Sequence, residues 1–145
     1  MKHSAKTEYA AIAVLELARQ RSAAEPVRIR DIAAAHGIPA RFLVQILLQL
    51  KTAGLVGSTR GAGGGYQLLC DPAEITLEDV VRVFEGPGDN AAAPPAPRAG
   101  RPRMQATLRD AWRDVAEAEA AALRSITFAD LMERSRTAGE AMYYI

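Results

Sequence analysis

The chain has 145 residues, of which 49% are hydrophobic and 24% are charged, values ordinary for a globular protein that buries a core. It contains no run of about 18 uncharged apolar residues and begins with a charged amphipathic segment, so we expect neither a membrane span nor a signal peptide. Its single cysteine excludes an intrachain disulfide and favours a cytoplasmic protein.

The net charge of +1 conceals an uneven distribution of charge along the chain. Residues 1–70 carry nine Lys and Arg against four Asp and Glu, whereas residues 71–103 and 104–145 each have an excess of two acidic residues. A basic half of this kind suits an anionic partner such as nucleic acid. A basic surface without a partner explains the charge equally well.

The first half of the chain has the pattern of a helical domain. Ser4 is a suitable cap for a first helix, and Gly37 and Gly54 favour the ends of two later ones. The predicted segments are a helix over 5–21, a very short strand over 27–29, a helix over 31–36 and a helix over 40–53.

The last two of these helices are joined by the short turn at residues 36–39, which predicts a helix-turn-helix. In such a motif the second helix reads DNA. Its predicted apolar side consists of Phe42, Leu43, Ile46, Leu47 and Leu50.

A glycine-rich run follows in the sequence STRGAGGGYQLL, residues 58–69. Such a run can cradle a phosphate or form the tip of a β-hairpin. A Walker-type loop requires a lysine and a hydroxyl residue after the last glycine, at the start of a helix. Here Tyr66 begins a segment with strand composition, so we predict a hairpin, which after a helix-turn-helix is a wing.

The second half reads as helices separated by a linker. Thr76 with Asp79 resembles a capping box for a helix that ends near residue 85. Residues 86–103 are rich in Pro, Gly and Ala and predict a linker loop. A long helix over about 104–124 follows, then a short last helix starting near Thr127, and a tail over 138–145.

With the wing placed, the chain resembles the Rrf2 family of bacterial transcription regulators over residues 1 to about 135. The segments that carry this resemblance are 7–10, 32–33, 37–38, 42–43, 45–47, 50–51, 53–56, 60–61, 63–66, 75–77, Trp112 and 126–131. The resemblance implies a mainly α fold: a winged helix-turn-helix domain with a two-stranded β wing over 1–85, the linker over 86–103, and a dimerisation helix, last helix and tail over 104–145. It also implies a dimer in which the long helices cross.

The predicted DNA contacts lie on the reading helix and on the wing. Arg41 and Gln45 can bind guanine and adenine edges, although both can also be solvated surface residues. Family members carry a polar reader where this chain has Val44, which would contact a thymine methyl instead. Arg60 resembles the arginine that the family inserts into a minor groove. The other predicted contacts are Lys51, Ser58, Thr59, Gly61, Gly63, Gly64 and Gly65, with Arg28 and Arg30 as further phosphate contacts.

The apolar stripe of the long helix predicts the dimer interface. Its members at this interface are Leu108, Trp112, Val115 and Leu123. The alternative is that Trp112 packs on its own winged-helix domain.

Many Rrf2 proteins bind an iron–sulfur cluster through three cysteines before the long helix, but residues 86–103 contain no cysteine and no histidine. Glu8 matches a carboxylate ligand of some relatives, and a lone carboxylate does not hold a cluster. We therefore expect no metal and no cofactor. Cys70 is either a small buried residue or a redox switch, and the effector is either a partner protein or a small molecule.

These observations predict a cytoplasmic, homodimeric, sequence-specific DNA-binding regulator that represses transcription from a palindromic operator. The alternative is a winged-helix module that docks on a partner protein. An enzyme is not expected, because the two histidines, His3 and His36, form no recognisable catalytic set.

Overall fold

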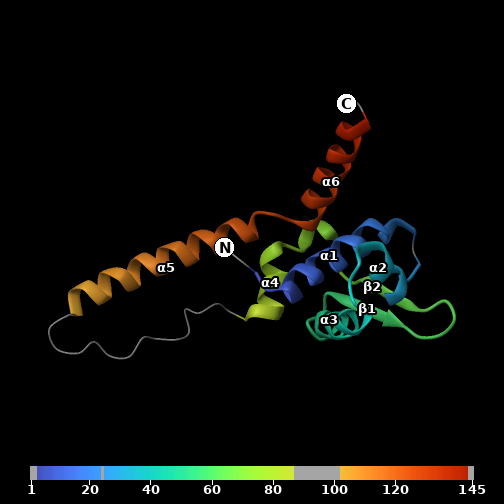
Figure 1. The fold of residues 1–145 in the computed structure, drawn as a ribbon, viewed down its shortest axis with the longest axis horizontal. Helices are drawn as coiled ribbons and strands as arrows, with labels where there is room; N and C mark the ends of the chain where they lie inside the picture. Colours follow the sequence, from blue (N-terminus) through green and yellow to red (C-terminus); the bar gives the residue numbers. More distant parts are fainter. Residues whose placement is uncertain (1–2, 24, 87–101, 144–145) are drawn as a thin grey trace.

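In the computed structural model, which describes residues 3–23, 25–86 and 102–143, the chain forms a small helical body from which two long helices project (Figure 1). The elements are α1 (Ala5–Arg19), α2 (Ile29–His36), α3 (Ala40–Thr52), β1 (Val56–Thr59), β2 (Gly65–Leu68), α4 (Leu77–Glu85), α5 (Pro102–Arg124) and α6 (Phe128–Tyr143). Short 3-10 helices cover Arg21–Ala23 and Pro72–Glu74. No helix in these described segments has the length and apolarity needed to cross a membrane.

Local signals in the sequence determine where several helices begin and end. The Ser4 hydroxyl accepts a hydrogen bond from the Thr7 N–H at 3.2 Å and caps α1. Thr76 and Asp79 form a reciprocal capping box at the start of α4. Gly37 ends α2 with a φ of +65°, a conformation that glycine adopts without strain. These predicted caps are confirmed.

The core of the body forms where α3 crosses α1. Leu43, Ile46, Leu47 and Leu50 are fully buried, and their three- and four-residue spacing places them on one side of α3. They pack in one cluster with the apolar side of α1, which contributes Ala10, Ala13, Val14 and Leu17. Burial of each large aliphatic side chain contributes about 1.5–3 kcal/mol. The opposite side of α3 is thereby left on the surface.

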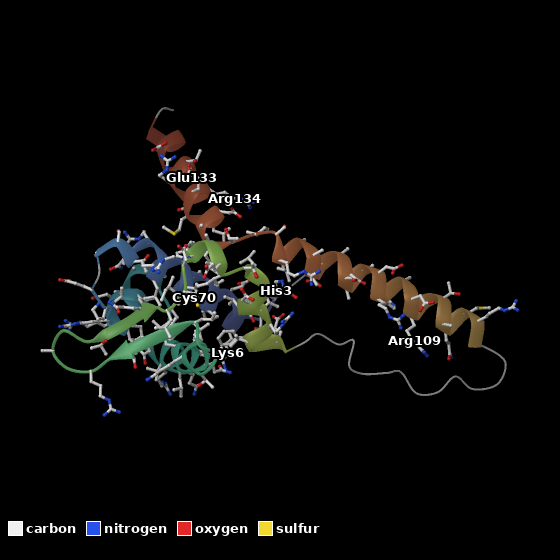
Figure 2. All side chains as sticks on the ribbon, turned by 180° about the vertical axis from the view of Figure 1, so that it is seen from behind. His3, Lys6, Cys70, Arg109, Glu133 and Arg134 are labelled. Carbon is white, nitrogen blue, oxygen red and sulfur yellow. The ribbon has the colours of Figure 1, made fainter. Side chains whose placement is uncertain are left out.

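The glycine-rich run forms the predicted wing. Strands β1 and β2 pair antiparallel, with Val56 opposite Leu68 and Thr59 opposite Gly65. The loop between them extends from the side of the body opposite to α5 (Figures 1 and 2). Together with the helix-turn-helix, this hairpin confirms a mainly α, winged-helix fold.

The last helix is anchored in the body by its first residue. The Phe128 side chain is fully buried in the same core as α1 and α3. The Phe128 N–H donates to the Ile75 carbonyl at 2.9 Å, and the Leu77 N–H donates to the Ile126 carbonyl at 3.0 Å. Residues beyond the long helix therefore complete the core of the body.

Three expectations from the sequence are wrong in detail. Phe42 is 50% exposed, because the four buried residues of α3 already fill the stripe that faces the core. Residues 27–29 form no strand, since Val27 makes a single bridge to Tyr66 and Ile29 already begins α2. The last helix is long, because it continues through the predicted tail to Tyr143. Ion pairs of Arg136 with Glu133 and Glu140 lie along it.

The predicted linker is described only at its ends. Gly86 closes α4, and Pro102 and Arg103 already belong to α5. Residues 87–101 lie outside the described part of the chain.

Candidate nucleic-acid interface

The outer side of α3 carries the side chains predicted to read DNA. Arg41, Val44 and Gln45 are exposed, with Val44 at 47%. Neither the Arg41 nor the Gln45 side chain makes a hydrogen bond or an ion pair to any residue in the described segments. These donors are consequently available to an external acceptor. Leu48, at 59% exposed, extends the same side with an apolar surface that sequence reasoning overlooked.

The glycines of the wing have unequal roles. A Cβ on Gly64 would stand 2.2 Å from the Thr59 carbonyl oxygen, and a Cβ on Gly65 would stand 2.5 Å from the Val27 carbonyl oxygen. Gly61 has a φ of +107°, which other residues rarely adopt. A Cβ on Gly63, by contrast, would meet nothing within 4 Å. Three of the four glycines are therefore needed for the backbone path itself.

The wing and α3 are connected by a direct hydrogen bond. The Lys51 ammonium, near the end of α3, donates to the Ser58 hydroxyl of β1 at 2.6 Å. Thr59, the last residue of β1, and Arg60, the first residue after it, are both exposed. Within the described chain Arg60 makes no hydrogen bond or ion pair. Two unpaired guanidinium groups, Arg41 and Arg60, are thus presented by two elements that contact each other.

The helix-turn-helix is fastened to α1 by a buried carboxylate that sequence reasoning missed. Glu16 is 6% exposed and accepts hydrogen bonds from Arg19 at 2.6 Å, Gln20 at 2.8 Å and His36, the last residue of α2, at 3.1 Å. The Arg19 guanidinium above all, with Gln20 and His36, lowers the pKa of Glu16 from 4.5 to about 2, although burial alone would raise it. In the sequence, Glu16 stands next to apolar residues of α1, and this position was the available signal that its carboxylate is buried.

The long helix α5 carries a continuous exposed apolar stripe. Leu108, Trp112 and Val115 are 56%, 64% and 50% exposed, and Met104 continues the stripe at 78%. Trp112 therefore does not pack on its own winged-helix domain. Leu123, near the body, is partly buried. Stripes of this size on one side of a helix are typical of surfaces that a partner covers.

The start of α1 ties the body to α5. The His3 ring Nδ1 lies 3.0 Å from Glu85 Oε2, and its Nε2 lies 3.9 Å from Glu119 Oε1 on α5. The Ser4 N–H and the Thr7 hydroxyl both donate to Glu85 Oε1 at 3.1 Å. Burial opposes ionisation of Glu85, but these hydrogen bonds hold its pKa below the usual value. Figure 2 shows His3 where α4 and α5 meet.

A family model described as "Rrf2: Iron-dependent Transcriptional regulator" matches residues 3–134. The chain belongs to the Rrf2 family. CymR of Bacillus subtilis, an HTH-type transcriptional regulator, is 34% identical over 146 residues, and the match covers all of both proteins. IscR of Vibrio atlanticus, also an HTH-type transcriptional regulator, is 33% identical over 137 residues, which cover 92% of this chain and 76% of that one.

Solved structures agree with this assignment. The structure of T. potens IscR has a TM-score of 0.77 and 31% identity, covering 95% of this chain and 90% of that one. CymR of B. subtilis, described as a global cysteine regulator, has a TM-score of 0.68 and 32% identity, covering 92% and 98%. This Rrf2 chain is therefore a DNA-binding transcription regulator of the winged helix-turn-helix type.

The residues of this Rrf2 chain do not fit the iron centre that the family description implies. A cluster needs several thiolates, and the chain has one cysteine. The Cys70 thiol lies 3.9 Å from the Gly54 carbonyl and packs against the core of the body (Figure 2). Among residues 3–23, 25–86 and 102–143, no group of three or more His, Cys, Asp or Glu side chains is arranged to hold a metal ion.

Proposed function

We propose that this regulator is a homodimeric, cytoplasmic repressor that binds a palindromic operator through α3 and the wing without an iron–sulfur cluster. Arg41, Val44 and Gln45 read base edges in the major groove, and Arg60 enters the adjoining minor groove. Lys51, Ser58 and Thr59 contact phosphates, and Gly61, Gly63, Gly64 and Gly65 let the wing backbone approach the DNA.

The observation that carries this proposal is the pair of exposed guanidinium groups on α3 and the wing, neither of which has an intramolecular partner in the described chain. A guanidinium binds the O6 and N7 atoms of guanine through two parallel hydrogen bonds. It is also attracted by the strong negative potential of a narrow A·T-rich minor groove. A helix in one groove and a wing in the next use both properties.

The exposed stripe of α5 supports the homodimer. A second copy of the helix would cover Leu108, Trp112 and Val115, which are at least half exposed in the single chain. A two-fold axis through such an interface presents two reading helices in opposite orientations. The operator is then a palindrome whose half-sites are one or more helical turns apart.

The test is selection of bound duplexes from a random DNA pool by the purified protein, at near-physiological salt and without added iron. The expected result is a palindrome with an A·T-rich segment beside each half-site. Arg41→Ala and Arg60→Ala should each remove enrichment at a different part of the site. Arg134→Ala, which removes an exposed cation from α6 on another side of the molecule (Figure 2), is the control and should select the same sequence.

The selection experiment tests the homodimer and the DNA interface separately. Enrichment without symmetry would contradict the homodimer. Absence of enrichment, together with a DNA affinity that does not change with salt, would contradict the DNA interface and favour a module that docks on a protein. Transcription in vitro from a promoter that overlaps the selected site distinguishes repression, which we expect, from activation.

A further inference from the structure

Arg28 connects the helix-turn-helix to the tip of the wing. It is the residue immediately before α2, and its guanidinium donates a hydrogen bond to the carbonyl of Ala62, in the middle of the glycine run. The neighbouring residue, Val27, exchanges two backbone hydrogen bonds with Tyr66, each 2.8 Å long. Residues 27 and 28 therefore hold the wing at two points, one on β2 close to the tip-side end of the strand pair and one in the tip itself.

The tip has few other interactions that define its conformation. The last pair of the hairpin ladder is Thr59 with Gly65, so the residues between them lie beyond the sheet. Inside the tip, the Gly64 N–H donates to the Gly61 carbonyl at 3.0 Å. Ordering a residue costs about 1–2 kcal/mol of backbone entropy, and glycine loses more than other residues. A bond from outside the loop is what opposes this cost.

The next arginine provides an informative contrast. Arg30 is exposed and, within the described segments, its side chain makes no hydrogen bond or ion pair. Arg28 and Arg30 thus stand two residues apart with the same charge, but only Arg28 is bound to the wing. The sequence predicts a phosphate contact for both, whereas the structure separates them.

We propose that Arg28 is a positioning residue for the wing: it fixes the tip through Ala62 and so sets how Arg60 enters the minor groove. Arg30 is the phosphate contact of this pair. The inference rests on the proposed contact between the wing and DNA. Part of the regulator's preference for particular DNA sequences then depends on Arg28, a residue that does not itself contact a base.

The test compares Arg28→Ala, Arg28→Lys and Arg30→Ala in the full chain, first without DNA. Backbone ¹⁵N relaxation at Ala62 and Gly63 measures order on the ps–ns timescale. We expect order parameters near 0.85 in the wild type and in Arg30→Ala, below about 0.6 in Arg28→Ala, and largely restored in Arg28→Lys, whose ammonium can donate to the same carbonyl. An unchanged tip in Arg28→Ala would overturn the proposal.

The second measurement is selection from the random duplex pool by the same variants. The net contribution of one hydrogen bond corresponds to a factor of about 3–10 in an equilibrium constant. Arg28→Ala should lower the preference for A·T at the positions facing the wing by about that factor and leave the rest of the site unchanged. A loss shared equally by all sequences, as expected for Arg30→Ala, would instead make Arg28 a phosphate contact and overturn the proposal. If the wild type selects no sequence, the proposed function fails while the relaxation measurement still decides the role of Arg28.

Discussion

The backbone of Gly65 lies directly against the backbone of Val27, so that a Cβ at Gly65 would stand 2.5 Å from the Val27 carbonyl oxygen and 2.6 Å from its carbon. The hydrogen bonds between Val27 and Tyr66 hold the two segments at this separation. The wing is therefore packed against the chain that leads into α2. Its glycines provide close approach as well as a turn.

This packing predicts a large loss of stability for one glycine substitution in the wing and almost none for another two residues away. Gly65→Ala places a methyl group into the Val27 backbone and should separate β2 from Val27, with a loss of stability of about 1–3 kcal/mol. DNA affinity should fall as well, because the wing moves. Gly63→Ala is the matched control, since the space around Gly63 is open, and should change stability by less than about 0.5 kcal/mol. Urea unfolding measures both, and equal effects would contradict the required close approach.

A second prediction concerns acid stability and follows from Glu16. Its pKa is about 2 in the folded chain, against 4.5 as the ordinary value. Because the folded pKa is the lower one, the contribution of the carboxylate to stability is complete above pH 4.5 and is lost as the pH falls toward 2. The shift corresponds to no more than about 3 kcal/mol, at 1.36 kcal/mol per pH unit.

The measurement is the free energy of unfolding in urea at pH 7, 4.5 and 3. Glu16→Gln should lower stability at pH 7, since the charged partner of Arg19 and His36 is gone, and should flatten the decline between pH 4.5 and 3. Glu25→Gln is the control, because Glu25 is an exposed carboxylate of the same region. A decline of the same steepness in Glu16→Gln and the wild type would show that other groups cause the acid sensitivity.

Much of the fold could be predicted from the sequence because its signals are local. Ser4, Gly37 and the pair Thr76 and Asp79 act within one helical turn, and each is where the sequence predicts it. The length of α6 could not be predicted in this way. The cap at Thr127 indicates only where that helix begins, and Gly139, a residue type that favours helix ends, lies inside the helix without ending it.

The residues of the candidate site also divide into those that a local signal predicts and those that only the packing of elements reveals. Exposure of Arg41 and Gln45 follows from the helical period once the buried side of α3 is known. The contact of Arg28 with Ala62 joins residues 34 apart, and that of Glu16 with His36 joins residues 20 apart. The residue spacing within one helix cannot predict such contacts, because they form only when separate elements pack against each other. This is why the two arginines near α2 could not be distinguished from the sequence.

A third prediction concerns the proposed dimer. Trp112→Glu places a charge in the exposed stripe of α5 and should convert the dimer into a monomer in sedimentation velocity. The winged helix should remain folded, because Trp112 is 64% exposed in the single chain. Operator affinity should fall by about 100-fold or more, since the two half-sites are no longer bound by linked modules. Asp114→Asn, about 200° away around the helix, is the control. A Trp112→Glu dimer would contradict the assigned interface.

The last prediction separates a base-reading contact from a phosphate contact on α3. Arg41→Ala should cost about 1–3 kcal/mol on the selected operator and relax the preference at one base pair in each half-site. Lys51→Ala should weaken binding to all sequences alike and reduce the slope of log affinity against log salt by about 0.9. Lys51 also donates to Ser58, so a Ser58→Ala control shows how much of its effect acts through the wing. Titrations at several salt concentrations, on the operator and on a scrambled duplex, measure both quantities. Uniform weakening by Arg41→Ala would reassign Arg41 to the phosphate backbone and leave Val44 and Gln45 as the base-reading residues of α3.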